Sequence, residues 1–248
     1  MILCLLLLFG MLIPPTLLLT CVYPFSRRLS ARISEYITTV CARRFFAILK
    51  TYLHFDFVQY RDTIKDLPEQ FLILSNHQSL IDIVVYFNFF FWKKVRFVAK
   101  DNLSTVPMVG KMLKSQGHCM IPRRGSPAVA MKALSSFGES VKKDVDVLPL
   151  IFPEGTRSKD GQLGKFYSAG FRMLSQTVRL PVVVCALDGG WKLSNLTRIV
   201  SSLRTGSYKV KVLKVYEAPK DKEDEKLILE ESYGLIEKQL SEWRSGVL

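Results

Sequence analysis

The chain has 248 residues, a length that accommodates one catalytic domain and an appendage. Its formal net charge is +13, but no Lys/Arg-rich run of the kind typical of nucleic-acid binding occurs. The basic pairs at 27–28, 43–44 and 93–94 instead lie beside apolar segments, which favours an anionic membrane surface as partner and argues against nucleic acid. The five cysteines are widely spaced and form no Cys-x-x-Cys pair, so neither a disulfide framework nor a zinc site is indicated.

Residues 1–26 contain no charged side chain and are rich in leucine. They fit a membrane-spanning helix, a kinked or re-entrant anchor, or a cleaved signal peptide. A signal peptide normally begins with a basic segment, which is missing here. Pro14 and Pro15 are expected to break or kink the helix, leaving two pieces that are each too short to cross a bilayer. We therefore favour the kinked or re-entrant anchor.

Apolar residues recur at helical spacing within residues 29–57, with basic residues among them. This pattern predicts an amphipathic helix in the membrane interface, the alternative being a helix that faces the core of the catalytic domain. We expect three parts: a membrane anchor (1–57), a catalytic domain (58–220) and a C-terminal amphipathic helix packed on that domain (221–248). The predicted location is a membrane of the plasma, inner or endoplasmic-reticulum type, with the catalytic domain facing the cytosol.

Downstream of the anchor, short apolar runs alternate with amphipathic segments. Strands are predicted at 71–74, 95–99, 145–152, 181–187 and 208–215. Helices are predicted to begin near Ser79 and to span 126–143, 166–177 and 221–244. This alternation predicts an α/β fold with a mostly parallel central sheet flanked by helices.

Residues 76–82 read Asn-His-Gln-Ser-Leu-Ile-Asp and follow the first of these strands. His77 and Asp82 are five positions apart, which does not place both on one face of a regular helix. They can meet only if His77 lies in the turn before a helix and Asp82 in its first turns. Asp82 would then fix the tautomer of His77 and leave the other ring nitrogen free to take a proton. The alternative is a histidine in a turn and an aspartate that stabilises a helix N-terminus.

Residues 152–158 read Phe-Pro-Glu-Gly-Thr-Arg-Ser and also follow a predicted strand. Gly155 allows backbone to approach a ligand closely, Arg157 can bind a phosphate through two hydrogen bonds, and Thr156 can add a donor. Glu154 is expected to orient Arg157 or the acceptor. The alternative is a polar turn closed by an internal salt bridge. A base with its orienter and an anion site together favour acyl transfer onto a hydroxyl of a phosphate-bearing acceptor.

These motifs resemble those of the glycerolipid acyltransferases typified by 1-acylglycerol-3-phosphate acyltransferases. Residues 76–82 match the family's histidine–four residues–aspartate block, and residues 152–158 match its third block almost letter for letter. Residues 117–123 resemble the second block, a glycine followed six residues later by arginine, and residues 180–184 resemble the fourth. A second block less apolar than usual, and Val184 where a proline is usual, leave the lipid class open.

The resemblance implies an acyltransferase fold, an acyl-CoA or acyl carrier protein donor and a lysophospholipid acceptor, with no metal or other cofactor. It implies His77 as general base and Asp82 as its orienter. The residues expected to bind the acceptor are Lys100, Arg123, Glu154, Gly155, Thr156 and Arg157. The expected product is phosphatidic acid, formed in phospholipid biosynthesis by acylation of the sn-2 hydroxyl of 1-acylglycerol-3-phosphate. The alternatives are another lysophospholipid or lyso-aminolipid acceptor, and a non-catalytic protein that binds lipid through its basic surface.

Three finer expectations concern the surroundings of the site. Backbone N–H groups near the start of the helix after His77 are expected to hold the oxyanion. The aromatic run at 87–92 is interpreted either as a wall of an acyl-chain tunnel or as ordinary core. His118 is predicted to be structural and not catalytic.

Overall fold

The computed structural model describes the whole chain except residues 1, 107–108, 123–125, 194–205 and 247–248. The described strands form a seven-stranded sheet in the order β1-β7-β6-β2-β5-β3-β4. Their bounds are β1 Asp56–Gln59, β2 Leu72–Ser75, β3 Lys94–Lys100, β4 Cys119–Ile121, β5 Val147–Ile151, β6 Val182–Asp188 and β7 Ser207–Tyr216. Every pair is parallel except β6 with β7. The predicted mostly parallel α/β fold is confirmed, and β1 crosses the expected domain boundary at residue 57.

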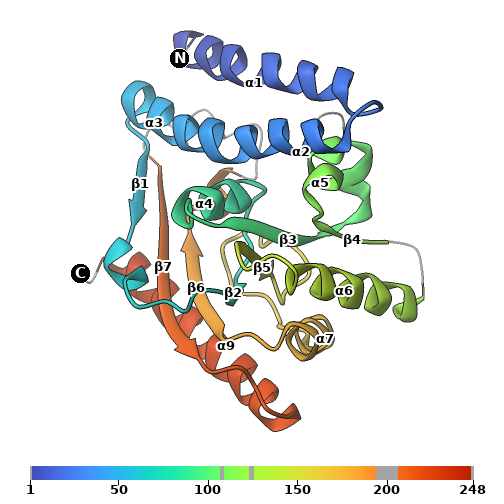
Figure 1. The fold of residues 1–248 in the computed structure, drawn as a ribbon. Coiled ribbons are helices and arrows are strands. Elements are labelled where there is room, and N and C mark those ends of the chain that lie inside the picture. The colour runs from blue at the N-terminus through green and yellow to red at the C-terminus, as the bar shows by residue number, and fades with distance from the viewer. Residues whose placement is uncertain (1, 107–108, 123–125, 194–205, 247–248) are drawn as a thin grey trace.

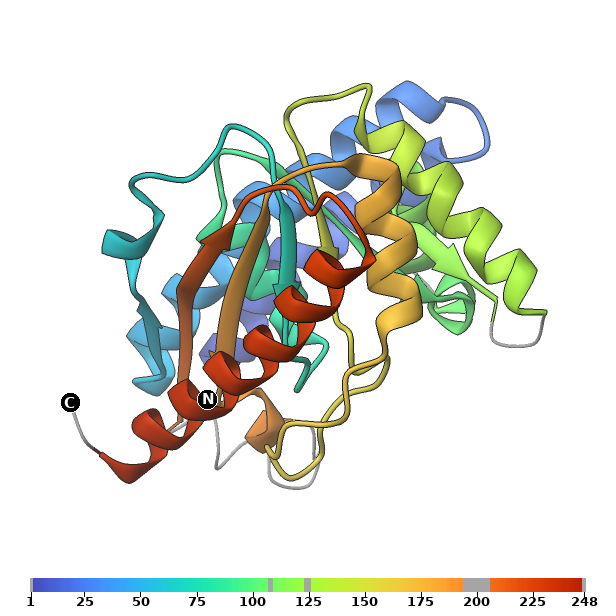
Figure 2. The same ribbon diagram turned by 90° about the horizontal axis from the view of Figure 1, so that it is seen from below.

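Helices cover both faces of this sheet, and an additional helical layer lies at the N-terminus (Figure 1). The helical elements are α1 Ile2–Val22, α2 Arg27–Tyr36, η1 Ile37–Cys41, α3 Ala42–Leu53, η2 Arg61–Ile64, α4 Ile81–Phe89, η3 Asp101–Thr105, α5 Val109–Gln116, α6 Pro127–Val141, α7 Ser168–Val178, η4 Gly190–Leu193 and α9 Lys222–Ser245. Figure 2 shows α7 and α9 over one face of the sheet, with the N-terminal helices behind the other.

The central strands have apolar side chains on both faces. All residues of β2 and β5 are buried, as expected for parallel strands that are covered by helices on each side. One core joins β2 and β5 to α3 and α4, and a second core lies between the opposite face of the sheet and α6, α7 and α9. This packing fixes the carboxyl ends of β2 and β5, from which the two sequence motifs continue.

Helix α1 continues without interruption through Pro14 and Pro15. Pro15 has no N–H to donate to the Met11 carbonyl, and the Cys41 Sγ lies 3.9 Å from that carbonyl oxygen and donates to it. Packing against the neighbouring helical layer thus compensates for the lost backbone bond. The predicted break into two pieces is therefore wrong, whereas the predicted kink stays a prediction.

The described part of the chain has one helix that is long and apolar enough to cross a membrane, at Leu3–Val22. Its mean hydropathy is 2.3, and only 11% of this stretch is buried, because one side packs on α2 and α3 while the other is open. Helix α3 differs: its apolar residues Phe46, Leu49 and Leu53 belong to the catalytic core. For α3 the structure therefore supports the core-facing alternative and not a helix whose apolar face meets lipid.

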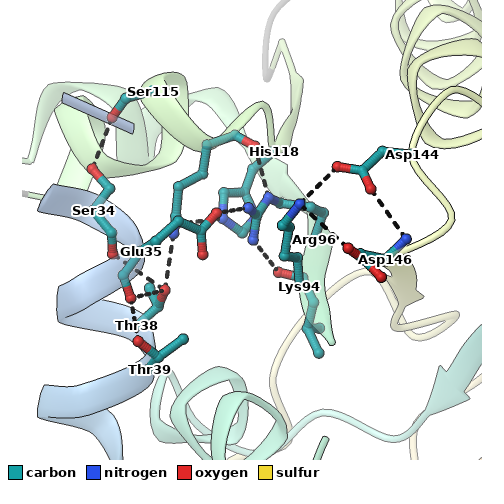
Figure 3. Close-up of polar contacts among 12 residues, drawn as sticks. Ser34, Glu35, Thr38, Thr39, Lys94, Arg96, Ser115, His118, Asp144 and Asp146 are labelled. Atoms are coloured by element: carbon teal, nitrogen blue, oxygen red, sulfur yellow. Dashed lines mark hydrogen bonds and ion pairs between the residues drawn. The ribbon is translucent and has the colours of Figure 1, made fainter. Parts of the chain in front are cut away.

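A polar cluster joins α2 to the sheet (Figure 3). Arg96 of β3 is buried, and its guanidinium forms an ion pair with Glu35 of α2. Ser34 and Ser115 share a hydrogen bond of 2.9 Å, which ties the same helix to α5. His118 is also buried here, as predicted for a structural histidine. The N-terminal helices are thus held to the strand that leads into Lys100.

Candidate active site

His77 and Asp82, predicted to form a pair, are brought together by a turn that is followed by a helix. Strand β2 ends at Ser75, His77 lies in the turn, and Asp82 lies in the first turn of α4. The Nδ1 of His77 is 2.7 Å from the Oδ2 of Asp82. Asp82 is fully buried, whereas His77 remains partly accessible. The contact leaves the Nε2 of His77 as the ring nitrogen that can face a substrate.

Asp82 has three further hydrogen-bond donors. The N–H groups of Gln78 and Ser79 donate to its Oδ2 at 2.6 and 3.0 Å, and the hydroxyl of Tyr208 donates to its Oδ1. Both carboxylate oxygens are therefore held, which fixes the orientation of the carboxylate against His77. Because these two N–H groups point to Asp82, they are not free to bind an oxyanion. The expectation of N–H donors near the start of α4 named no residue and stays a prediction.

Neighbouring amide side chains tie the turn to the end of β6. Asn76 forms two hydrogen bonds with the backbone of Leu187, of 2.8 and 2.9 Å, and so extends the pairing of β2 with β6. Gln78 accepts from the Gly190 N–H at 3.0 Å and donates to Asp188 at 3.2 Å. These buried bonds set the position from which His77 projects.

The second motif contacts the first directly. The rings of His77 and Phe152 are stacked, with centroids 4.0 Å apart and planes inclined by 9°. Glu154 accepts from the His77 N–H at 2.7 Å and from the Gly164 N–H at 2.9 Å, and the Ser158 N–H donates to the His77 carbonyl at 2.8 Å. Residues 152–158 therefore hold the backbone of the histidine on one side.

The structure shows which groups Glu154 contacts. Both of its oxygens accept backbone N–H groups, and its expected role in orienting Arg157 or the acceptor stays a prediction. Burial raises the pKa of the Glu154 carboxyl, and the hydrogen bonds from His77 and Gly164 oppose that rise. Within the described part of the chain no ion pair includes Arg157, so the alternative of a turn closed by an internal salt bridge is not supported.

A cavity of about 520 Å³ opens beside His77. Its polar lining includes Lys100 at the end of β3 together with Thr156 and Arg157, which are exposed. Its apolar lining is supplied by Leu80, Ile83, Phe97, Val98, Ala99, Leu103, Ile121, Ala130, Met131, Leu134, Ile151 and Phe152. Volume and lining resemble those of small-molecule sites that combine a few polar groups with an apolar interior.

The predicted site residues thus fall into two groups. His77, Lys100, Gly155, Thr156 and Arg157 line the cavity. Asp82 and Glu154 contact His77 but are not part of the lining. Gly155 has a φ of +62°, a left-handed conformation that glycine adopts without strain. Arg123 lies outside the described residues.

Two findings bear on the sequence interpretation of the surroundings of the site. The aromatic run at 87–92 does not line the cavity: Phe89 and Phe90 are fully buried in the core, and Phe91 and Trp92 are exposed. Its interpretation as a tunnel wall is therefore wrong. The contact of Tyr208 with Asp82 was not predicted from the sequence. The available signal was a tyrosine in a strand with alternating apolar residues, because a buried tyrosine hydroxyl needs a hydrogen-bond partner.

The fold and the site together define an α/β protein with a histidine–aspartate pair at the edge of an apolar cavity. Residues 58–188 match the family model described as Acyltransferase, and the chain belongs to this family.

Named relatives agree with this assignment. A 1-acyl-sn-glycerol-3-phosphate acyltransferase of Pseudomonas aeruginosa is 38% identical over 129 residues, which are 51% of this chain and 48% of that protein. The chloroplastic 1-acyl-sn-glycerol-3-phosphate acyltransferase BAT2 of Brassica napus is 36% identical over 121 residues, which are 48% of this chain and 33% of that protein. The chain therefore spans a third to a half of the length of these relatives.

A solved structure shows the same fold. The crystal structure of the 1-acyl-sn-glycerophosphate (LPA) acyltransferase PlsC from Thermotoga maritima superimposes with a TM-score of 0.62. The match covers 92% of this chain and 87% of that one at 19% sequence identity.

Proposed function

We propose that this protein transfers an acyl group from acyl-CoA or acyl carrier protein to the sn-2 hydroxyl of 1-acylglycerol-3-phosphate, which forms phosphatidic acid. The observation that carries the proposal is the contact of His77 with Asp82 at a cavity that has cationic groups and an apolar interior. The names of the relatives from Pseudomonas and Brassica support the same acceptor.

His77 is the general base of this proposal. Its Nε2 removes the proton of the acceptor hydroxyl as the oxygen attacks the thioester carbonyl. Asp82 stabilises the imidazolium that forms, because its Oδ2 accepts the Nδ1 hydrogen. When the tetrahedral intermediate collapses, the carbon–sulfur bond breaks and the proton passes from His77 to the departing thiolate. The thioester already provides an activated acyl group, so we assign no role to a metal or another cofactor.

The cavity lining contains both polar and apolar groups, which suit the two ends of the acceptor. Arg157, Lys100 and Thr156 are assigned to its phosphate, which they would bind through charge-assisted hydrogen bonds, and their place in the cavity lining supports this. The apolar lining suits an acyl chain. Arg123 is assigned to the same phosphate on the family resemblance. Glu154 and Gly155 contribute indirectly, Glu154 by holding the His77 backbone and Gly155 by shaping the turn.

We further propose that α1 associates the protein with a membrane and that the catalytic domain faces the cytosol. The apolar, open side of the helix at Leu3–Val22 supports membrane association. The arginines at 27–28, directly after this helix, support a cytosolic orientation.

The test is acyl transfer by membranes that contain the protein, with labelled acyl-CoA and a panel of lysolipids that includes 1-acylglycerol-3-phosphate. His77→Ala should lower the rate by ~10²–10⁴-fold, the range typical of general base catalysis. The matched control is His54→Asn, because His54 lies outside the cavity and asparagine tolerates its left-handed conformation.

A normal rate for His77→Ala would overturn the mechanism. Turnover of a different lysolipid alone would retain the mechanism and change the acceptor. Lipid binding without turnover of any acceptor, with either donor, would favour the non-catalytic alternative.

A further inference from the structure

A second pocket, of about 470 Å³, shares no lining residue with the His77 cavity. It forms where α3 meets β1, the start of η2 and the C-terminal end of α4. Its floor includes Phe46 and Phe57, whose rings stack with centroids 4.1 Å apart. The remaining lining residues are Arg43, Ala47, Lys50, Gln59, Arg61, Asn88 and Phe91. Three of them are cationic, and none is acidic.

Two of the cations converge on one aromatic ring. The guanidinium carbons of Arg43 and Arg61 each lie 5.1 Å from the centroid of Phe91. Attraction to the ring offsets part of the repulsion between the two arginines. Burial of part of the side chain, and then the charge of Arg43, lower the pKa of Arg61, a residue that remains exposed overall.

Among the described residues, no carboxylate forms an ion pair with the cations of this pocket. None of the ion pairs among the described residues includes Arg43, Lys50 or Arg61. Arg61 donates to two neutral acceptors, the side-chain oxygen of Gln59 at 2.7 Å and the Asn88 carbonyl at 3.2 Å. These bonds orient the guanidinium and leave its full charge available, an arrangement suited to an anion that accepts several hydrogen bonds.

The position of the pocket indicates where the anion comes from. Helix α3, which supplies Arg43 and Lys50, packs against α1, the helix with the open apolar side. Phe91 lines the pocket, the Trp92 ring lies edge-on to the Phe91 ring at 5.4 Å between centroids, and the two side chains are 43% and 42% exposed. Exposed aromatic rings next to arginines and an apolar helix are typical of segments at the headgroup level of a bilayer.

We propose that this pocket binds the headgroup phosphate of an anionic phospholipid of the membrane with which α1 associates. The inference rests on the proposed membrane association of α1, but it does not depend on acyl transfer. The site is distinct from the place at which the acceptor phosphate is expected, since Lys100 and Arg157 line the other cavity.

The test measures binding of the purified full-length protein to phosphatidylcholine vesicles with and without phosphatidylglycerol, at physiological ionic strength so that diffuse attraction is screened. Arg43→Gln and Arg61→Gln should each weaken binding to the phosphatidylglycerol vesicles by about tenfold, the effect of losing one hydrogen bond between charged groups. Binding to pure phosphatidylcholine should change much less.

The chain provides a matched control in Arg44→Gln. Arg44 is exposed, adjacent to Arg43 on the same helix, and absent from the pocket lining. Diffuse attraction to an anionic surface would weaken binding equally in the Arg43 and Arg44 variants, and that result would overturn the proposal. Arg43 makes none of the hydrogen bonds that hold Arg61. Weaker vesicle binding by Arg43→Gln therefore cannot be attributed to the loss of those bonds.

A second arm distinguishes a lipid from free phosphate. The thermal midpoint of the protein in neutral detergent is measured with phosphatidylglycerol and, separately, with inorganic phosphate. Stabilisation by the lipid that is lost in Arg43→Gln but kept in Arg44→Gln supports the proposal. Equal stabilisation by inorganic phosphate would overturn the lipid assignment. Acyl transfer assayed on the same samples reports separately on the proposed function.

Discussion

Tyr208 is a buried side chain that reaches the candidate active site from β7, outside the segment matched by the family model. Its hydroxyl donates to the Asp82 Oδ1, the oxygen that does not contact His77. Gly190 leaves room for this contact, since a Cβ there would lie 2.9 Å from that oxygen. Burial raises the pKa of Tyr208 well above 10.0, so the hydroxyl remains a donor at neutral pH.

We therefore expect Tyr208→Phe to lower kcat by about tenfold with little change in KM, since a hydrogen bond to a charged group contributes ~1.5–3 kcal/mol and three other donors still hold Asp82. The measurement is steady-state acyl transfer. Tyr216→Phe is the matched control, because Tyr216 is on the same strand and bonds Glu231 instead. Equal rates for Tyr208→Phe and the control would exclude a positioning role for Tyr208.

At the scale of single residues, the sequence predicted the contact between residues close together in the chain and missed the contacts between residues far apart in it. The spacing of His77 and Asp82 allowed one geometry, a turn followed by a helix, and that geometry is the one observed. The bonds from Tyr208 to Asp82 and from the His77 N–H to Glu154 join residues far apart in the chain. Nothing in the local pattern specifies such partners, because tertiary packing brings them together.

At the scale of elements, the junction of α2 with β3 contains a buried histidine whose protonation the fold opposes. The Nδ1 of His118 accepts from the Phe97 N–H at 3.1 Å, and its Nε2 donates to the Gln116 side chain at 3.1 Å. Burial, and then the charge of Arg96, lower the pKa of His118 well below 6.5. The imidazole is thus held neutral next to the ion pair that joins α2 to β3.

This arrangement predicts a pH dependence of stability. Because the pKa of His118 is lower in the folded protein, the unfolded chain binds the proton first as the pH falls below ~6.5. The free energy of unfolding should then decrease by at most ~1.4 kcal/mol per pH unit from this group. His118→Asn, whose Oδ1 can replace the Nδ1 as acceptor, should reduce that slope in denaturant unfolding between pH ~5 and ~7. If the free energy of unfolding changed with pH in parallel for the wild-type protein and His118→Asn, the assignment of this pH dependence to His118 would be wrong.

Helices and strands, like side-chain contacts, were predicted where the local sequence pattern determines them. The buried strands β2, β5 and β6 have continuous apolar runs and were predicted. The short edge strands β1 and β4 were missed, because four and three residues with partial exposure give little periodicity. The break expected in α1 failed for a related reason: the Cys41 thiol of a different helical element satisfies a carbonyl that Pro15 leaves free.

At the scale of the whole molecule, exposed apolar side chains gather on α1, which lies at the opposite end of the molecule from α9 (Figure 1). Leu6, Phe9 and Leu17 of α1 are 62%, 56% and 61% exposed, whereas the opposite side of this helix contacts α2 and α3. A soluble protein rarely leaves a continuous apolar patch of this kind in water. The patch therefore favours contact of α1 with the bilayer.

The corresponding prediction is that Leu6→Glu combined with Leu17→Glu moves the protein from the membrane pellet to the supernatant after carbonate extraction. A charged side chain costs about 2.5–3.5 kcal/mol at the centre of a membrane helix and less towards its ends, so two of them on the exposed face of α1 should weaken the apolar contact strongly. Leu227→Glu is the matched control, because Leu227 is 53% exposed on α9, at the other end of the molecule. If the double variant stays in the pellet as firmly as this control, α1 is not the element that holds the protein to the membrane. If it leaves the pellet but still acylates detergent-dispersed substrate, the membrane contact and the histidine–aspartate site are separable functions of the chain.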